Sequence, residues 1–180
     1  MAVSRPLTAA EFAALEFAHD TRTELVHGRI VKMSPGGVQH SQTVVKLMAE
    51  LMRWCQAGAG GLVGAQLGCV LAPNMVRSAD VSYLSPERSA SIGDQDQFLS
   101  GPPDLAVEVV SLHERAIRIE EKILDYLAAG TPLLWVIYPR LRSVHMIRPG
   151  LPRHVLTAGA TLSAPDILPG FALSVESLFE

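Results

Sequence analysis

Two acidic side chains interrupt segments that otherwise read as apolar strands. Glu108 lies in "DLAVEVV", residues 104–110, and Asp80 lies in "VRSADVSYL", residues 76–84. A carboxylate in apolar surroundings is costly to ionise unless a partner compensates it. If the two strands pair antiparallel, Asp80 and Glu108 could face each other and would repel unless a cation lies between them. Because Mg²⁺ often binds one or two carboxylates together with water, a divalent-metal site is one interpretation of this pattern.

Spacing alone leaves a structural interpretation of these residues open. Glu108 could form an ordinary ion pair with Arg115 or Arg118, which follow it along the chain. Lys122, on a predicted helix, could extend outward to solvent. It could also place its ammonium over the acidic site and stabilise an anionic transition state. Glu24, taken alone, is typical of an exposed strand residue.

The elements that must position these residues follow from hydrophobic periodicity and turn signals. The expected order is a helix opening at Thr8, a hairpin over 24–33, a helix over 40–56, strands over 64–72 and 75–84, a long polar stretch over 85–102, a strand over 104–110, a helix over 112–129, and strands over 132–138 and 143–148. This order predicts one domain over residues 1–180, of α/β (α+β) class. We expect a mixed β-sheet flanked by helices, with an N-terminal β-hairpin.

Helix ends are indicated by capping patterns. Thr8 with Glu11, and Ser111 with Glu114, each form the Ser/Thr-x-x-Glu pattern of a capping box, which predicts two helix starts. Gly130 is expected to end the second of these helices, in the usual role of glycine after a helix.

Composition excludes some classes of protein and fits others. The chain has 180 residues, 48% of them hydrophobic, and a net charge of −3. No apolar run approaches the roughly 20 residues that cross a membrane, so we expect no membrane partner. Glu11 and Glu16 argue against a signal peptide. Two cysteines without metal-like spacing fit free thiols, and we expect a cytoplasmic location.

Charge is uneven along the chain. Residues 126–165 contain no acid and no lysine, but they include Arg140, Arg142, Arg148 and Arg153. This segment predicts a local basic face, and a solvated arginine-bearing surface is the alternative.

Several of these segments together resemble a known family. They are "ELVHGRIVKMSP", a histidine before a helix (His40), "VRSADVSYL", "GPPDLAVEVVS", "RIEEKILDYLAAGTPLLWVIYP" and "LPGFALSVESLF". Their order and spacing are similar to those of the Uma-type putative restriction-endonuclease family, within the PD-(D/E)xK nuclease superfamily. The resemblance covers nearly the whole chain and implies the restriction-endonuclease-like fold.

The resemblance also implies a set of site residues. It assigns Asp80 and Glu108 to the two motif acids, which with the backbone carbonyl of Val109 would bind Mg²⁺ or Mn²⁺. The motif lysine is expected two positions after the second acid, where this chain has Val110. The resemblance implies that this lysine comes instead from the following helix, at the position of Lys122.

Two further positions are matched by the resemblance. Glu24 matches the glutamate of the N-terminal hairpin and is expected to hold a metal-bound water. His40 matches a recurrent position, where we expect it to cap the long helix or to pack; a catalytic role is the alternative.

Three positions depart from the pattern of the family. Ala79 stands where a proline often precedes the motif aspartate, His27 replaces an aspartate in the hairpin turn, and Arg118 replaces an aspartate four residues before the lysine. None of these changes removes a proposed ligand.

The resemblance implies a metal-dependent endonuclease that hydrolyses phosphodiester bonds, with DNA as the expected nucleic-acid partner and a homodimer as the expected assembly. Two alternatives stay open. One is a catalytically silent nucleic-acid-binding or regulatory module on the same fold. The other is a structural interaction protein whose acids are paired with arginines.

Overall fold

The structure, a computed structural model, describes residues 5–16, 22–93, 97–112 and 114–180. The helices are α1 (Ala9–Ala13), α2 (Val38–Trp54), α3 (Pro86–Ala90) and α4 (Ala116–Ala129), with helical turns η1 (Cys55–Ala59), η2 (Pro139–Leu141) and η3 (Glu176–Leu178). The strands are β1 (Thr23–Val26), β2 (Arg29–Lys32), β3 (Leu62–Ala65), β4 (Gly68–Ala72), β5 (Met75–Ser78), β6 (Val81–Leu84), β7 (Leu99–Ser100), β8 (Leu105–Val109), β9 (Leu133–Tyr138), β10 (Ser143–Ile147), β11 (His154–Leu156), β12 (Thr161–Ala164) and β13 (Leu168–Ser174).

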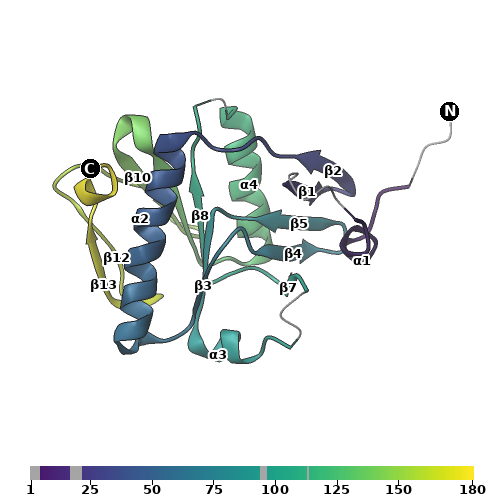
Figure 1. Cartoon of the computed structure of the whole chain (residues 1–180), viewed down its shortest axis with the longest axis horizontal. Helices are drawn as coiled ribbons and strands as arrows, with labels where there is room; N and C mark the ends of the chain where they lie inside the picture. The colour runs from purple at the N-terminus through teal and green to yellow at the C-terminus, as the bar shows by residue number, and fades with distance from the viewer. Residues whose placement is uncertain (1–4, 17–21, 94–96, 113) are drawn as a thin grey trace.

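The predicted fold class is confirmed. In the described residues, a six-stranded mixed sheet has the order β11-β10-β9-β8-β6-β3, and a five-stranded sheet has the order β2-β1-β5-β4-β7. Helices α2 and α4 lie on opposite faces of the six-stranded sheet (Figure 1). The N-terminal hairpin β1-β2 turns at His27 and Gly28, whose φ angles of 48° and 74° are those of a tight primed turn.

One long hairpin joins the two sheets and carries Asp80. The sequence predicted single strands over 64–72 and 75–84, and that prediction is wrong in one respect: each is divided in two. Strands β3 and β6 belong to the six-stranded sheet, whereas β4 and β5 belong to the five-stranded sheet. Gln66, with φ of 54°, accepts the left-handed conformation at the joint, and its N–H donates to the Ala79 carbonyl at 3.1 Å. Asp80 therefore lies at a bend.

Strand β8, helix α4 and strand β9 form the unit that presents Glu108 and Lys122. Strands β8 and β9 are parallel, with Glu108 opposite Val136, so α4 is the crossover between them. The prediction that Ser111 and Glu114 cap this helix is wrong. The helix starts at Ala116, and Arg115 at the N-cap makes no side-chain cap. The predicted end is confirmed, because Gly130 closes α4 with φ of 96°.

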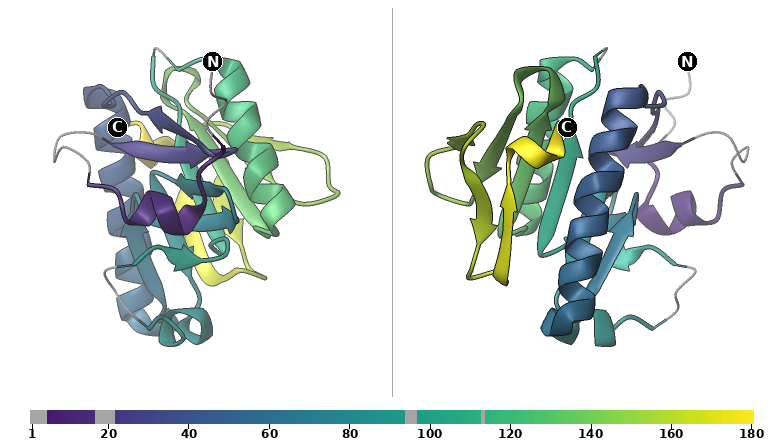
Figure 2. Two further views of the ribbon diagram at one scale, coloured as in Figure 1. Left: turned by 90° about the vertical axis from the view of Figure 1, so that its right-hand side faces the viewer. Right: turned by 60° about the vertical axis from the view of Figure 1, so that its left-hand side comes forward.

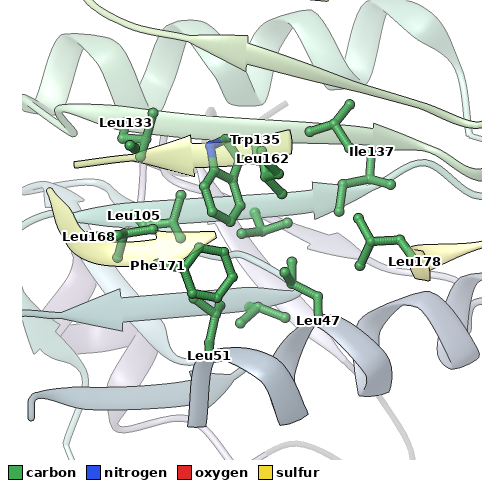
Figure 3. Packing of buried hydrophobic residues seen from close by; sticks show 14 of the residues in the cluster. Leu47, Leu51, Leu105, Leu133, Trp135, Ile137, Leu162, Leu168, Phe171 and Leu178 are labelled. Atoms are coloured by element: carbon green, nitrogen blue, oxygen red, sulfur yellow. The ribbon is translucent and has the colours of Figure 1, made fainter. Parts of the chain in front are cut away.

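The core has two parts, one on each face of the six-stranded sheet. Leu105, Val107 and Val109 of β8 pack on one side, where α2 contributes Leu47 and Leu51. Figure 3 shows these leucines directed toward the aromatic rings of the sheet and of β13. The C-terminal hairpin β12-β13 (yellow) lies beside α2 in the right-hand view of Figure 2 and completes this side of the core.

The second part of the core lies beneath α4. Ala106 of β8 packs there with Ile119, Ile123 and Tyr126 of the helix. Glu108 shares the face of Ala106, since alternate residues of a strand point to the same side. The carboxylate of Glu108 is therefore directed toward α4, and this explains why a helix residue is its partner.

Two other predictions need correction. The polar stretch over 85–102 is not a plain loop, because it contains α3 and β7, although residues 94–96 lie outside the described part. The long helix begins at Val38, earlier than the predicted residue 40. Among the described residues, no helix is both long and apolar enough to cross a bilayer.

Candidate active site

Asp80 is held at the bend between β5 and β6 by three donors. Arg22 Nη1 donates to Oδ1 at 3.1 Å, His40 Nε2 lies 3.1 Å from Oδ2, and the Val109 N–H donates to Oδ2 at 2.9 Å. Burial opposes ionisation of this carboxyl group. The hydrogen bonds from His40 and Val109, together with the charges of His40 and Arg22, outweigh burial and lower the pKa of Asp80 to about 2. The ionised form of Asp80 is therefore favoured more than that of an ordinary aspartate.

Glu108 lies next to Asp80 on the neighbouring strand, as predicted. The antiparallel pairing of β6 with β8 ends at Val81 opposite Val107, so Asp80 and Glu108 are the next residues along the two strands. Burial raises the pKa of Glu108 to about 8, the ammonium of Lys122 acts in the opposite direction, and the charges of Asp80 and Glu24 raise it further. Its Oε1 is buried and has no hydrogen-bond partner in the described part of the chain.

Lys122 reaches Glu108 from α4. Its Nζ lies 2.8 Å from Glu108 Oε2 and 3.7 Å from Glu24 Oε1. The side chain is 4% exposed, so it is turned inward and does not extend to solvent. Burial disfavours the ammonium, but the carboxylates of Glu108 and Glu24 outweigh burial and raise the pKa of Lys122. A fixed cation therefore lies beside the two acids.

Glu24 belongs to a buried ionic network behind the lysine. Arg77 Nη1 donates to Glu24 Oε2 at 2.8 Å, and the Ser78 N–H donates to Glu24 Oε1 at 3.1 Å. Arg77 Nε also donates to Asp125 at 2.9 Å, one turn along α4 from Lys122. The network ties the N-terminal hairpin, β5 and α4 together, and thereby fixes the helix turn that carries Lys122.

The acids and the lysine form the floor of a cleft with a volume of about 870 Å³. Its walls are the segment from Met33 to His40, the start of α4, and the residues that follow β8 and β9. Asp80, Glu108 and Lys122 line it, but Glu24 does not. The carboxyl ends of adjacent parallel strands are a common place for binding sites in mixed and parallel sheets.

The cleft offers oxygen ligands of the kind that a divalent cation needs. Asp80 and Glu108 supply hard carboxylate oxygens, and the unpartnered Oε1 of Glu108 is free to accept a cation. Within the described ranges, no three His, Cys, Asp or Glu side chains come together as a metal cage. Two carboxylates completed by water fit Mg²⁺, which rarely uses an all-protein cage. The residues therefore fit such an ion, provided that Arg22 releases Oδ1 of Asp80 while His40 and Val109 hold Oδ2.

Some predicted contacts differ in the structure. Glu108 pairs with Lys122, and not with Arg115 or Arg118, so the proposed Glu–Arg pair is wrong. His40 does not cap α2, because Gly37 is the N-cap residue; the imidazole contacts Asp80 instead.

The predicted basic face over 126–165 is largely neutralised. Arg148 pairs with Asp166, and Arg153 pairs with Glu120, at distances of 2.6 and 2.9 Å. Arg142 lies 3.9 Å from Glu176. Only Arg140 of this group lines the cleft among the described residues.

Three contributors to the site were not identified from the sequence. The first is Asp125. Its spacing of three residues from Lys122 places both on one helix face, so the sequence did carry a signal for it. Arg77 and Arg22 gave no local signal, because their partners are distant: Arg77 lies 53 residues from Glu24, and Arg22 lies 58 residues from Asp80.

The fold is shared with a solved protein of known structure. The chain is similar to a crystal structure described as a putative nuclease belonging to DUF820 from Anabaena variabilis, with a TM-score of 0.84. The match covers 97% of this chain and 98% of that chain at 21% identity, which establishes a shared fold. The chain belongs to the Uma2 family, described as "Putative restriction endonuclease", which matches residues 9–176. No curated protein matches it in sequence.

Proposed function

We propose that the protein is a metal-dependent endonuclease that hydrolyses phosphodiester bonds of DNA. The observation that carries this proposal is the meeting of Asp80, Glu108 and Lys122 on the floor of one cleft, with the lysine 2.8 Å from Glu108. Buried acids beside a fixed ammonium, at the base of an open cleft, are typical of a site built for chemistry. Membership of a family described as restriction endonucleases supports the same assignment.

The two acids share one task in this proposal. Asp80 and Glu108, with the Val109 carbonyl, would hold Mg²⁺ or Mn²⁺. When bound, such an ion lowers the pKa of an attacking water and neutralises charge on the scissile phosphate. Arg22 and His40 hold Asp80 in place by hydrogen bonds of 3.1 Å each. The N–H of Val109 fixes the same carboxylate relative to β8.

Lys122 supplies the fixed positive charge. Its ammonium would orient the attacking water or stabilise the additional negative charge on the phosphoryl oxygens in the transition state. Glu24 would act through Lys122, because both of its oxygens already contact Arg77, Ser78 or the lysine. This assignment replaces the expected contact between Glu24 and a metal-bound water.

A second candidate function is a nucleic-acid-binding module without turnover. One observation favours it: both oxygens of Asp80 are engaged by protein donors. If Arg22 does not release Oδ1 of Asp80, the carboxylate is unavailable as a ligand.

The experiment that separates the two candidates is cleavage of circular DNA, single-stranded and supercoiled, with Mg²⁺ or Mn²⁺. The tested variants are Glu108→Gln and Lys122→Met. Glu87→Gln and Lys46→Met are the matched controls, since neither residue lines the cleft. We expect cleavage by the wild type and both controls, and none by the two site variants. Equal residual cleavage by all five proteins would reject the assigned site.

A further inference from the structure

Arginines without a carboxylate partner are concentrated at the cleft. Arg115, Arg118 and Arg140 line it, and their side chains make no hydrogen bond or ion pair in the described part of the chain. Apart from these three and Arg29, every arginine that the structure describes lies within 4.0 Å of a carboxylate. All four of these arginines are exposed, but Arg29 lies on β2 and does not line the cleft. The cleft therefore holds most of the unneutralised guanidinium groups.

The positions of Arg115 and Arg118 are unfavourable for the helix itself. Arg115 is the N-cap residue of α4 and Arg118 lies in its first turn, which contains no acid. The N-terminus of a helix carries partial positive charge, so acids are favoured there and cations are not. Departures from such a local rule are expected at functional sites. The two arginines are explained if an anion binds over this turn.

Arg140 completes the group from another element. It lies in η2, directly after β9, while Val110 directly follows the parallel neighbour β8. The Val110 N–H donates to the Ile137 carbonyl at 2.8 Å, so the two strand ends are held side by side. Arg140 and the start of α4 therefore line the same cleft above Glu108.

The size of the cleft limits the kind of polyanion that can enter. Its volume of about 870 Å³ is that of a pocket that encloses one small molecule. Asp80 and Glu108, on its floor, are only 4% and 2% exposed. A duplex is a stiff rod with a persistence length of about 50 nm, so it would lie across the mouth of the cleft and would not bend into it. A single strand is flexible enough to present one phosphate to buried acids.

The lining also indicates how a strand would be recognised. Among the described residues that line the cleft, none is Phe, Tyr or Trp, and the imidazole of His40 contacts Asp80, so the lining offers little for a base to stack on. Guanidinium groups bind phosphate oxygens, often in bidentate geometry. Contacts to phosphates position a nucleic acid but carry no sequence information directly.

We propose that Arg115, Arg118 and Arg140 form a clamp for the phosphates of a single DNA strand, on either side of the phosphate that reaches Glu108. The clamp recognises the backbone and not the base sequence. This inference deepens the proposed function, and rests on it for the position of the cut, but binding by the clamp does not require cleavage.

The test is equilibrium binding of the full-length protein to fluorescent oligothymidylate in EDTA, where metal-dependent cleavage cannot occur. Affinity is measured over a series of salt concentrations. Each phosphate contact in a single strand contributes about −0.7 to the slope of log K against log salt. We expect Arg115→Gln, Arg118→Gln and Arg140→Gln each to reduce the slope by about 0.7. Arg29→Gln, which removes an unpaired arginine outside the cleft, is the matched control and should leave the slope unchanged.

A second arm uses the same oligothymidylate annealed to its complement, and a third uses a single strand of mixed sequence. The proposal expects weaker binding of the duplex and equal binding of the two single strands. Equal binding of duplex and single strand would overturn the inferred substrate class. Slopes that are the same for Arg29→Gln and the three clamp variants would overturn the clamp. Binding as expected without any cleavage by the metal-loaded protein would reject the proposed nuclease function and leave the clamp standing.

Discussion

At the scale of single residues, the buried glutamate that breaks the strand over 104–110 has a defined set of neighbours. Glu108 contacts the ammonium of Lys122 through one oxygen, while its other oxygen is buried and unpartnered. Leaving a buried acceptor unsatisfied costs free energy of folding. That cost is explained if the unpartnered oxygen binds a ligand and does not stabilise the ligand-free protein.

Replacing Lys122 tests whether its charge acts in the transition state. Lys122→Met keeps the apolar stem and removes the ammonium, and we expect kcat for DNA cleavage to fall by about 10²- to 10³-fold. The affinity for Mn²⁺, measured by calorimetry, should be retained or increase because a cation leaves the site. A fall in kcat that is matched by Lys46→Met would show that the effect is not specific to the cleft.

Gly36 tests the contact between His40 and Asp80. A Cβ added at Gly36 would lie 2.3 Å from His40 Nδ1, so Gly36→Ala must displace the imidazole. The adjacent Gly37 has open space at its Cβ position and provides the control Gly37→Ala. We expect Gly36→Ala and His40→Ala each to lower the cleavage rate by about tenfold. The double variant should be no slower than either, since both changes remove one contact. Additive losses would contradict this account.

At the scale of elements, the site takes its lysine from helix α4 and not from strand β8. Val110 lies on the face of β8 that carries Glu108, whereas Lys122 reaches the same acid from α4. A lysine placed at position 110 in the Lys122→Met variant should therefore restore part of the cleavage activity. We expect Lys122→Met/Val110→Lys to cleave DNA faster than Lys122→Met alone, in the same plasmid assay. No gain over the single variant would mean that the position on α4 is itself required.

Sequence patterns predicted the elements better than they predicted their joints. Alternation along β8 correctly placed Glu108 on the face of Ala106, because a buried strand has a fixed period of two. Nothing local indicated that the strand over 75–84 bends at Asp80, since the division between two sheets depends on partners elsewhere in the chain. The start of α4 was predicted too early for a related reason. The capping pattern at Ser111 is local, whereas the helix begins after Arg115. The position of Arg115 is explained by its place in the lining of the cleft.

The candidate site was predictable in part. Asp80, Glu108, Lys122 and Glu24 came from the family resemblance, with strand alternation as support. The ionic network of Arg77 and the contacts of Arg22 depend on side chains more than 45 residues apart in the sequence. Such pairs are set by tertiary packing, and a single sequence does not specify them.

At the scale of the whole molecule, Glu108 links pH to stability. Its pKa is raised from an ordinary value of 4.5 to about 8. The unfolded chain therefore releases this proton at lower pH than the folded chain, and the folded state loses stability as pH rises from 4.5 to 8. Glu108→Gln removes this titration. We expect the variant to gain up to a few kcal/mol over the wild type by pH 8, and little at pH 4, in metal-free urea unfolding.

The pKa of Asp80 has the opposite consequence in a separate range of pH. It is lowered from 3.8 to about 2, so the stability that Asp80 contributes is present above pH 3.8 and is lost as pH falls toward 2. The two windows do not overlap. A wild-type stability that rises steadily from pH 5 to pH 8, relative to Glu108→Gln, would contradict the buried, raised state of Glu108.

In the proposed function Asp80 and Glu108 together hold one divalent ion, and calorimetric titration with Mn²⁺ measures this binding. We expect one site per chain in the wild type and in Glu87→Gln, and loss of that site in both Asp80→Asn and Glu108→Gln. Circular dichroism of each variant establishes that it is folded. Mn²⁺ binding that is unchanged in a folded Asp80→Asn or Glu108→Gln variant would contradict the account.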